Sequence, residues 1–100
     1  MAKYDIYITP QAYRDIDSIY KYIHDELLAE KASMDMVDAL DSVIMSLDEF
    51  PHRGAERKVG FFANRGYRQL FAKNYTIIYR IDEDRKRVVI NTVRYSHSSF

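Results

Sequence analysis

Three short apolar runs in the last third of the chain limit the folds that it can adopt. They cover residues 67–72, 75–81 and 88–95, and short polar breaks at 73–74 and 82–86 separate them. The runs are rich in β-branched and aromatic residues, which is typical of strands joined by tight turns. They predict an antiparallel meander, and the apolar face of such a sheet needs a second layer to cover it.

The first half of the chain predicts that covering layer. Residues 3–9 alternate apolar and polar side chains, as a half-buried strand does. Thr9 and Pro10 then place a capping hydroxyl and a proline at the start of a helix. The apolar stripe of this first helix consists of Ile16, Ile19, Tyr20, Ile23 and Leu27. This spacing puts one apolar face against the sheet.

A second helix is expected to begin near Ser33, a good N-cap residue, and to end at Phe50, because Pro51 disfavours helix in the residue before it. Its stripe consists of Met36, Val37, Leu40, Val43, Ile44 and Leu47. The intervening carboxylates, Asp15, Asp17, Asp38 and Asp41, are interpreted as a solvated face. The sequence thus predicts an α+β fold of order β-α-α-β-β-β. A helical hairpin packs on a small, mainly antiparallel four-stranded sheet, in one domain over residues 1–100.

Composition narrows the functional classes. The chain has 100 residues and no cysteine, which excludes disulfides and fits a cytoplasmic location. It has no apolar stretch of the roughly 20 residues that a membrane span requires, and no signal-peptide pattern at its start. The three histidines lie far apart in the sequence, and no glycine-rich nucleotide motif occurs. Neither a metal nor a cofactor is therefore expected.

The zero net charge conceals an asymmetry between the two halves. Residues 1–50 carry four Lys or Arg against eleven Asp or Glu, and residues 51–100 carry eleven against four. One interpretation is that the helices simply contain the acidic residues. The other is a basic surface on the sheet side that faces an anionic partner.

The segment 52–65 contributes to this basic half. It reads as a loop, with Val59, Phe61 and Phe62 as an anchor or a short strand. The candidate binding residues are Arg57, Lys58 and Arg65 from this loop and Arg80 from the strand at 75–81.

The candidate catalytic residues cluster at the end of the last strand, at Arg94, Tyr95 and His97. Arginine can neutralise a phosphate, histidine can move a proton near neutral pH, and tyrosine can stack on a base. The alternative is that the strand frays into a polar tail. Arg68 is a further candidate, and like Arg80 it shares a face with this cluster only if the strand register allows, because a slip of one residue reverses every side chain.

The whole chain resembles the RelE/ParE superfamily of toxins from bacterial type II toxin–antitoxin systems. The resemblance rests on the opening strand into Thr9-Pro10, the helical hairpin ending at Phe50-Pro51, and Arg68 after Gly66-Tyr67. It rests further on residues 74–81 and 93–97. The order and spacing of these segments carry the resemblance, rather than any single motif.

The resemblance implies a small growth-inhibiting toxin, a class linked to plasmid stabilisation, held inactive in a hetero-oligomer by a cognate antitoxin. Two targets are implied. ParE-like members poison DNA gyrase by binding. RelE-like members cut mRNA on the ribosome without a metal, and Arg68, Arg94 and His97 match basic or histidine positions of their site. A degenerate toxin that only binds its antitoxin is a third alternative.

One departure separates these alternatives. RelE-like nucleases commonly carry an arginine after the tyrosine that opens the third strand, whereas here Thr76 follows Tyr75. A hydroxyl cannot replace a cation at a phosphate. The sequence therefore favours the ParE-like action on DNA gyrase over the ribosome-dependent endoribonuclease.

Overall fold

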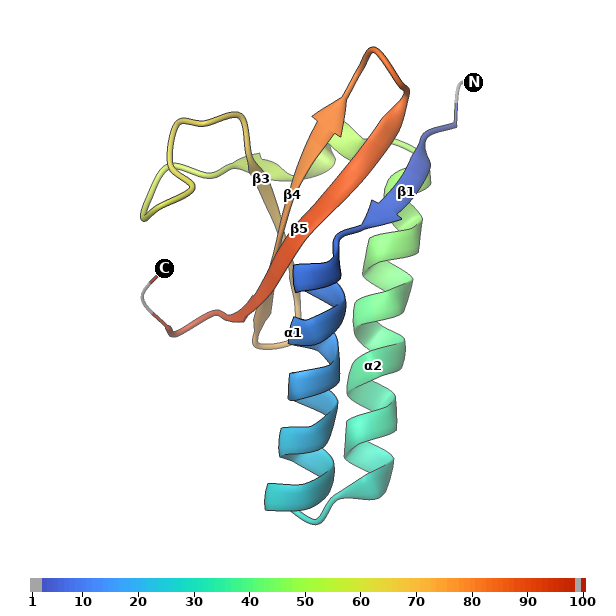
Figure 1. Cartoon of the computed structure of the whole chain (residues 1–100), viewed down its shortest axis with the longest axis vertical. Helices are drawn as coiled ribbons and strands as arrows, with labels where there is room; N and C mark the ends of the chain where they lie inside the picture. Colours follow the sequence, from blue (N-terminus) through green and yellow to red (C-terminus); the bar gives the residue numbers. More distant parts are fainter. Residues whose placement is uncertain (1–2, 99) are drawn as a thin grey trace.

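The structure is a computed structural model that describes residues 3–98 and 100. Two helices lie side by side against one face of a twisted sheet (Figure 1). The main elements are β1 (Asp5–Ile8), α1 (Pro10–Lys21), α2 (Glu30–Met45), β2 (Ala55–Glu56), β3 (Arg68–Ala72), β4 (Tyr75–Asp82) and β5 (Arg87–Tyr95). Shorter helical turns are η1 (Tyr22–Glu26), which continues α1, and η2 (Ser46–Asp48) and η3 (Pro51–Arg53), which follow α2. None of the helices in the described part of the chain has the length and apolar character needed to cross a bilayer.

The sheet confirms the predicted α+β class and corrects its strand count. Its order is β1-β5-β4-β3-β2, with β1 parallel to β5 and the other pairs antiparallel. The sheet thus has five strands rather than four. The additional strand, β2, has only two residues, Ala55 and Glu56, which pair with Gln69 and Arg68. Neither residue favours strands intrinsically, so only the pairing with β3 defines this strand.

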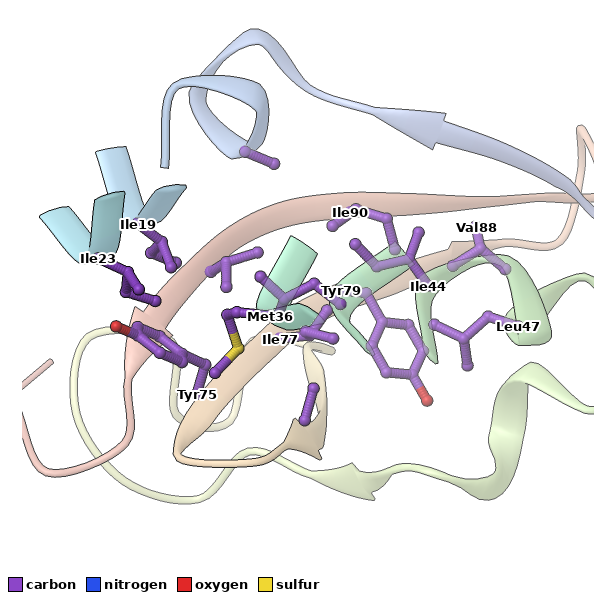
Figure 2. Close-up of a cluster of buried hydrophobic side chains, with 14 residues drawn as sticks. Ile19, Ile23, Met36, Ile44, Leu47, Tyr75, Ile77, Tyr79, Val88 and Ile90 are labelled. Atoms are coloured by element: carbon purple, nitrogen blue, oxygen red, sulfur yellow. The ribbon is translucent and has the colours of Figure 1, made fainter. Parts of the chain in front are cut away.

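The register of the meander decides which side chains face the helices. Tyr79 of β4 lies opposite Arg68 of β3, and Thr76 lies opposite Arg94 of β5. Alternate residues of β4, namely Tyr75, Ile77 and Tyr79, point toward the helices (Figure 2). Because side chains alternate along a strand, the residues between them point away. We call the side of the sheet that Thr76, Ile78, Arg80 and Arg94 share the outer face.

The core lies between the helices and the inner face of the sheet. The predicted stripes are largely confirmed, since Ile19 and Ile23 of the first and Leu40, Ile44 and Leu47 of the second are buried. Other predicted members are less buried: Ile16, Tyr20, Val37 and Val43 are half-buried, and Leu27 is exposed. Leu27, at 56% exposed, follows η1, where the chain leaves the helix before the connection to α2.

The predicted start of the first helix is confirmed and that of the second is wrong. The hydroxyl of Thr9 accepts a hydrogen bond from the amide of Ala12 at 3.1 Å. The second helix begins at Glu30, three residues before Ser33. Ser33 lies buried inside the helix, and its hydroxyl donates to the carbonyl oxygen of Glu30 at 2.6 Å. A left-handed residue, Leu28 at φ 51°, makes the sharp connection without glycine or proline.

The start of α1 covers the edge of β5 beyond the short strand β1. Thr9 donates from its amide to the carbonyl oxygen of Ile90 and from its hydroxyl to that of Asn91. A carboxylate oxygen of Asp15 then accepts from the amide of Val93 at 3.1 Å and from the hydroxyl of Thr92. The interpretation of Asp15 as part of a solvated face is therefore wrong, because its carboxylate replaces the hydrogen bonds of a missing neighbouring strand.

Candidate binding surfaces

A groove lined by aromatic side chains lies between the far end of the helical hairpin and the β3–β4 turn. Its volume is about 760 Å³. It is lined by Tyr22, Ile23, Leu27, Ala32, Asp35, Met36, Lys73, Asn74, Tyr75 and Tyr95. We call it the tyrosine groove. Tyr22, Leu27 and Tyr95 are each about half exposed, so a large apolar surface is open to solvent here.

The three tyrosines of the groove come from three separate elements. Tyr75 and Tyr95 are cross-strand partners on β4 and β5, and their ring centres lie 5.8 Å apart. Tyr22 approaches them from η1. Burial raises the pKa of the Tyr75 phenol, and the neighbouring Tyr22 and Tyr95 raise it further. The groove therefore presents three phenols, each with an apolar ring and a hydrogen-bonding tip.

The predicted cluster at the end of β5 divides between two sides of the sheet. Arg94 is exposed on the outer face, and its Nε donates to the hydroxyl of Thr92 at 3.0 Å. Tyr95 lines the tyrosine groove instead. His97 lies beside Tyr95, with 5.3 Å between the ring centres. Arg94 and His97 are thus both accessible, and His97 lies against the ring of Tyr95.

Arg68 does not join this cluster. Its register position opposite Tyr79 places it on the inner face, away from Arg94. Its Nη1 donates to the carbonyl oxygens of Gly54 at 2.7 Å and His52 at 3.2 Å. These bonds hold the segment around η3 against the sheet.

Thr76 is buried and its hydroxyl makes a hydrogen bond within the protein. Thr76 is 1% exposed, and its hydroxyl lies 2.8 Å from the hydroxyl of Ser96. Arg80 is exposed on the outer face. It stands four residues from Thr76 along β4, or about 13 Å at the rise of a strand. Arg94 lies opposite Thr76 on the neighbouring strand, so it is about as far from Arg80 as Thr76 is. The two arginines therefore do not converge on one point.

The loop cations have different environments. Arg57 is only 9% exposed, and its guanidinium donates to Gln69 Oε1 at 2.7 Å and to the carbonyl oxygen of Val59 at 3.0 Å. It also lies over the ring of Phe100, 4.4 Å from the ring centre. Lys58 and Arg65 are exposed. Because Gln69 pairs with Ile78 and shares its side, Arg57 fixes the loop over the outer face.

Two residues that matter for these surfaces escaped the sequence analysis. Asp15 holds the edge of β5, although the sequence alone indicates a solvated face there, and Tyr22 lines the groove but lies outside the predicted apolar stripe. The only indication in the sequence was that Asp15 and Tyr22 lie outside the apolar stripe of the first helix. In the part of the chain that the structure describes, no group of three His, Asp or Glu side chains is arranged to hold a metal ion.

The fold and these surfaces define a small α+β protein with an open aromatic groove and exposed cations on the outer face and the loop. The family model described as "ParE toxin of type II toxin-antitoxin system, parDE" matches residues 6–99. The chain therefore belongs to the ParE toxin family and is a toxin of the type II class, as the resemblance predicted. No curated protein matches the sequence.

Solved structures share the fold. The chromosomal ParDE system from P. aeruginosa superposes with a TM-score of 0.77 at 18% identity, covering 95% of this chain and 98% of that one. The toxin–antitoxin complex RelBE2 from Mycobacterium tuberculosis gives 0.66 at 22% identity, with 93% and 98% covered. A YoeB/ParE toxin from Agrobacterium tumefaciens gives 0.61 at 18% identity, with 91% and 96% covered. At these identities the likeness concerns the fold alone.

Proposed function

We propose that this toxin inhibits growth by binding DNA gyrase in the cytoplasm, without cutting RNA. The observation that carries the proposal is the dispersal of the candidate catalytic groups. Arg68 bonds backbone carbonyls on the inner face, Thr76 is buried against Ser96, and Arg94 remains on the outer face. Transition-state stabilisation at a phosphate needs donors that converge on one point. Dispersed groups suit a protein that acts by occupying its target.

The ribosome-dependent endoribonuclease is the second candidate. The observation in its favour is the accessibility of Arg94 and His97, which lie close to each other in the chain near Tyr95. In such an enzyme, Arg94 would stabilise the phosphate and His97 would move the proton. A toxin that has lost both activities and only binds its antitoxin is the third.

A direct assay of the purified toxin separates the candidates. The toxin is added to DNA gyrase in a supercoiling reaction, and in parallel to ribosomes translating a labelled mRNA. We expect loss of supercoiling, or accumulation of cleaved DNA, with intact mRNA. Cleavage of the mRNA with normal gyrase activity would establish the endoribonuclease instead. Normal behaviour in both assays would indicate the antitoxin-binding remnant.

We further propose that Arg94 and His97 contribute to toxicity rather than to folding. Both side chains are exposed, and the bond from Arg94 to Thr92 is not needed to satisfy Thr92, whose hydroxyl also donates to Asp15. The variant Arg94→Ala/His97→Ala is expected to melt within a few degrees of the parent and to lose growth inhibition. A folded and fully toxic double variant would exclude this cluster from the target contact.

The cognate antitoxin is proposed to occupy the tyrosine groove, forming a toxin–antitoxin hetero-oligomer. Aromatic and aliphatic side chains around a solvent-filled depression are the usual anchoring sites of a partner helix or tail. Tyr95 belongs to this groove and contacts His97, so an occupied groove would also cover one side of the Arg94–His97 cluster. The antitoxin would then shield residues that the target contacts.

Two adjacent leucines provide a matched test of the groove. Leu27 lines it, whereas Leu28 is 85% exposed and lies outside its lining. Leu27→Asp is expected to weaken antitoxin binding by about tenfold or more, since it places a charge in an apolar contact. Leu28→Asp serves as the control and should bind as the parent does, measured by calorimetric titration. Equal affinities for both variants would place the antitoxin elsewhere.

A further inference from the structure

The loop between β2 and β3 holds two large apolar side chains in water. Val59 is 61% exposed and Phe61 is 67% exposed, while the next residue, Phe62, is 9% exposed. Phe62 packs its ring edge-on against Tyr67, with 5.0 Å between the centres. The fold therefore uses Phe62 as the anchor of the loop. Phe61 makes an edge-to-face contact with Phe62, with 5.2 Å between the ring centres, while most of its surface stays exposed, as does that of Val59.

The exposure of Phe61 is built into an ordered loop. The amide of Arg57 donates to the carbonyl oxygen of Tyr67 at 2.8 Å, and the amide of Asn64 donates to that of Arg57 at 3.1 Å. The amide of Ala63 donates to the carbonyl oxygen of Gly60 at 3.1 Å. Together with the side-chain bonds of Arg57, these contacts tie the two ends of the loop to each other and to β3. Phe61 is thus presented outward from a fixed frame.

Positive charge surrounds the exposed ring. The guanidinium of Arg65 lies over Phe61, 4.7 Å from the ring centre. Lys58 lies next to Val59 and is exposed. Among the described residues, no carboxylate lies within the 4.0 Å limit of an ion pair from Lys58 or Arg65. We call Lys58, Val59, Phe61 and Arg65 the basic aromatic patch.

We propose that the basic aromatic patch is a docking surface for an acidic protein surface that offers an apolar pocket to Phe61. Its charge is complementary to carboxylates, and an exposed aromatic next to an arginine is the composition of an interface hot spot. A protein suits the patch better than a nucleic acid. Val59 cannot stack on a base, one face of Phe61 is occupied by Arg65, and two cations are few for phosphate binding.

The patch is separate from the tyrosine groove. None of its residues lines the groove. The loop extends to one side of the sheet, and the helices lie against the other (Figure 1). An antitoxin bound in the groove would leave the patch open, so we assign the patch to the target. This assignment rests on the proposed function, in which that target is DNA gyrase.

The test compares two double variants of the full chain. Phe61→Ser/Arg65→Glu alters the patch. Phe50→Ser/Arg85→Glu is the matched control, because Phe50 is 63% exposed and Arg85 is an exposed cation away from the loop. Affinity for purified DNA gyrase and for the antitoxin, thermal unfolding and growth inhibition are measured for each. We expect the patch variant to bind gyrase at least about tenfold more weakly than the control, with unchanged unfolding and antitoxin affinity.

Each other outcome has a distinct meaning. A patch variant that binds gyrase as the control does overturns the docking surface while the proposed function stands. A loss of antitoxin affinity in the patch variant also overturns it, since the patch would then belong to the antitoxin. If the unaltered toxin does not bind gyrase, the proposed function fails. The growth-inhibition measurement then tests the docking surface. A folded patch variant of full toxicity then overturns the docking surface, and a folded variant of lost toxicity with normal antitoxin binding supports it.

Discussion

At the scale of the residue, one buried phenol joins the end of the helical layer to the sheet. The hydroxyl of Tyr79 donates to the carbonyl oxygen of Pro51 at 2.6 Å and accepts from the amide of Gly54 at 3.1 Å. Burial raises the pKa of this phenol, which keeps it protonated and able to donate. A Cβ on Gly54 would lie 2.2 Å from the same oxygen, so the glycine is required by this close approach.

Tyr79→Phe tests this junction. The substitution leaves a buried amide and a carbonyl without a partner, which costs about 1–3 kcal/mol of unfolding free energy. Tyr75→Phe is the control, because Tyr75 is also buried on β4 and the structure records no hydrogen bond of its hydroxyl within residues 3–98 and 100. Urea unfolding of both variants gives the comparison. Equal stability losses would mean that the two bonds of Tyr79 contribute nothing measurable.

A second residue joins three segments at the opposite end of the sheet from the groove. Glu83 accepts from Tyr4 at 3.1 Å, lies 3.0 Å from Nε2 of His52 and 3.3 Å from Nζ of Lys86. The hydrogen bond from Lys86 and that from Tyr4 lower the pKa of this carboxyl below its ordinary value of 4.5. The carboxylate form is therefore favoured by folding.

Glu83→Gln should remove a pH-dependent part of the stability. A carboxyl with a lowered folded pKa stabilises the protein above its unfolded pKa, and the effect disappears as pH falls through the folded value. The variant is expected to be less stable than the parent at neutral pH and equally stable well below pH 4.5. Glu26→Gln, at an exposed carboxylate without an ion pair among the described residues, is the control. A difference that persists unchanged in acid would refute the linkage.

At the scale of the element, the basic loop depends on one glycine. Gly60 has φ 75°, and a Cβ there would lie 1.7 Å from the carbonyl oxygen of Phe100. Gly66 at the end of the loop has a similar φ of 82°, but nothing lies within 4 Å of its added Cβ. The two positions share a left-handed backbone, and they differ chiefly in the clash that an added Cβ on Gly60 would make with Phe100.

Comparing Gly60→Ala with Gly66→Ala therefore separates the cost of the left-handed backbone from the cost of the clash with Phe100. Both lose roughly 1 kcal/mol or more for a left-handed alanine. Gly60→Ala additionally displaces Phe100, which uncovers the buried Arg57, and should lose clearly more stability in urea unfolding. Similar losses in the two variants would show that the Phe100 contact does not stabilise the loop.

The helix α2 gives the most direct test of the core. Leu40 is fully buried among residues of β4 and β5. Leu40→Ala is expected to cost about 2–5 kcal/mol, because a cavity remains where the side chain was. Met45→Ala, on an exposed side of the same helix, is the control. A loss below roughly 0.5 kcal/mol for Leu40→Ala would be that of a surface residue and would contradict its place in the core.

At the scale of the whole molecule, the acidic half of the sequence forms both helices, and the basic half forms the loop and all strands of the sheet except β1. The helices carry most of the carboxylates, and the basic loop and outer face carry cations such as Arg65, Arg80 and Arg94. The tyrosine groove is mainly apolar. Its lining contains one carboxylate, Asp35, and one cation, Lys73. Partner binding at the two sites should therefore respond differently to salt.

We expect added salt to weaken target binding more than antitoxin binding. Raising the ionic strength from about 0.05 to about 0.5 M shortens the range of the electrostatic field and slows the association of oppositely charged surfaces. Association rates with gyrase should fall severalfold, while rates with the antitoxin should change less. The measurement is stopped-flow or biosensor kinetics at several salt concentrations. Equal salt dependence would mean that the charge asymmetry does not separate the two partners.

The local features of this protein follow directly from its amino-acid sequence. The strands of the meander, the cap at Thr9 and the apolar stripes of the two helices follow from side-chain period and capping, which depend on residues a few positions apart. The charge asymmetry and the family resemblance likewise follow from the sequence alone. The start of α2 was misplaced, because Ala29 and Leu28 make the connection without a recognisable signal.

The positions of the candidate site residues depend on how distant segments pair and pack. The register between β3 and β4 put Arg68 on the inner face and left Arg80 and Arg94 on the outer one. Pairing with β3 created β2 from two residues of low strand propensity. The approach of α1 to β5 allowed the Asp15 carboxylate to accept a hydrogen bond from the amide of Val93 at the edge of that strand. These outcomes depend on contacts between segments far apart in the chain. Register and burial are properties of such contacts, so the pattern within any one segment could not determine them.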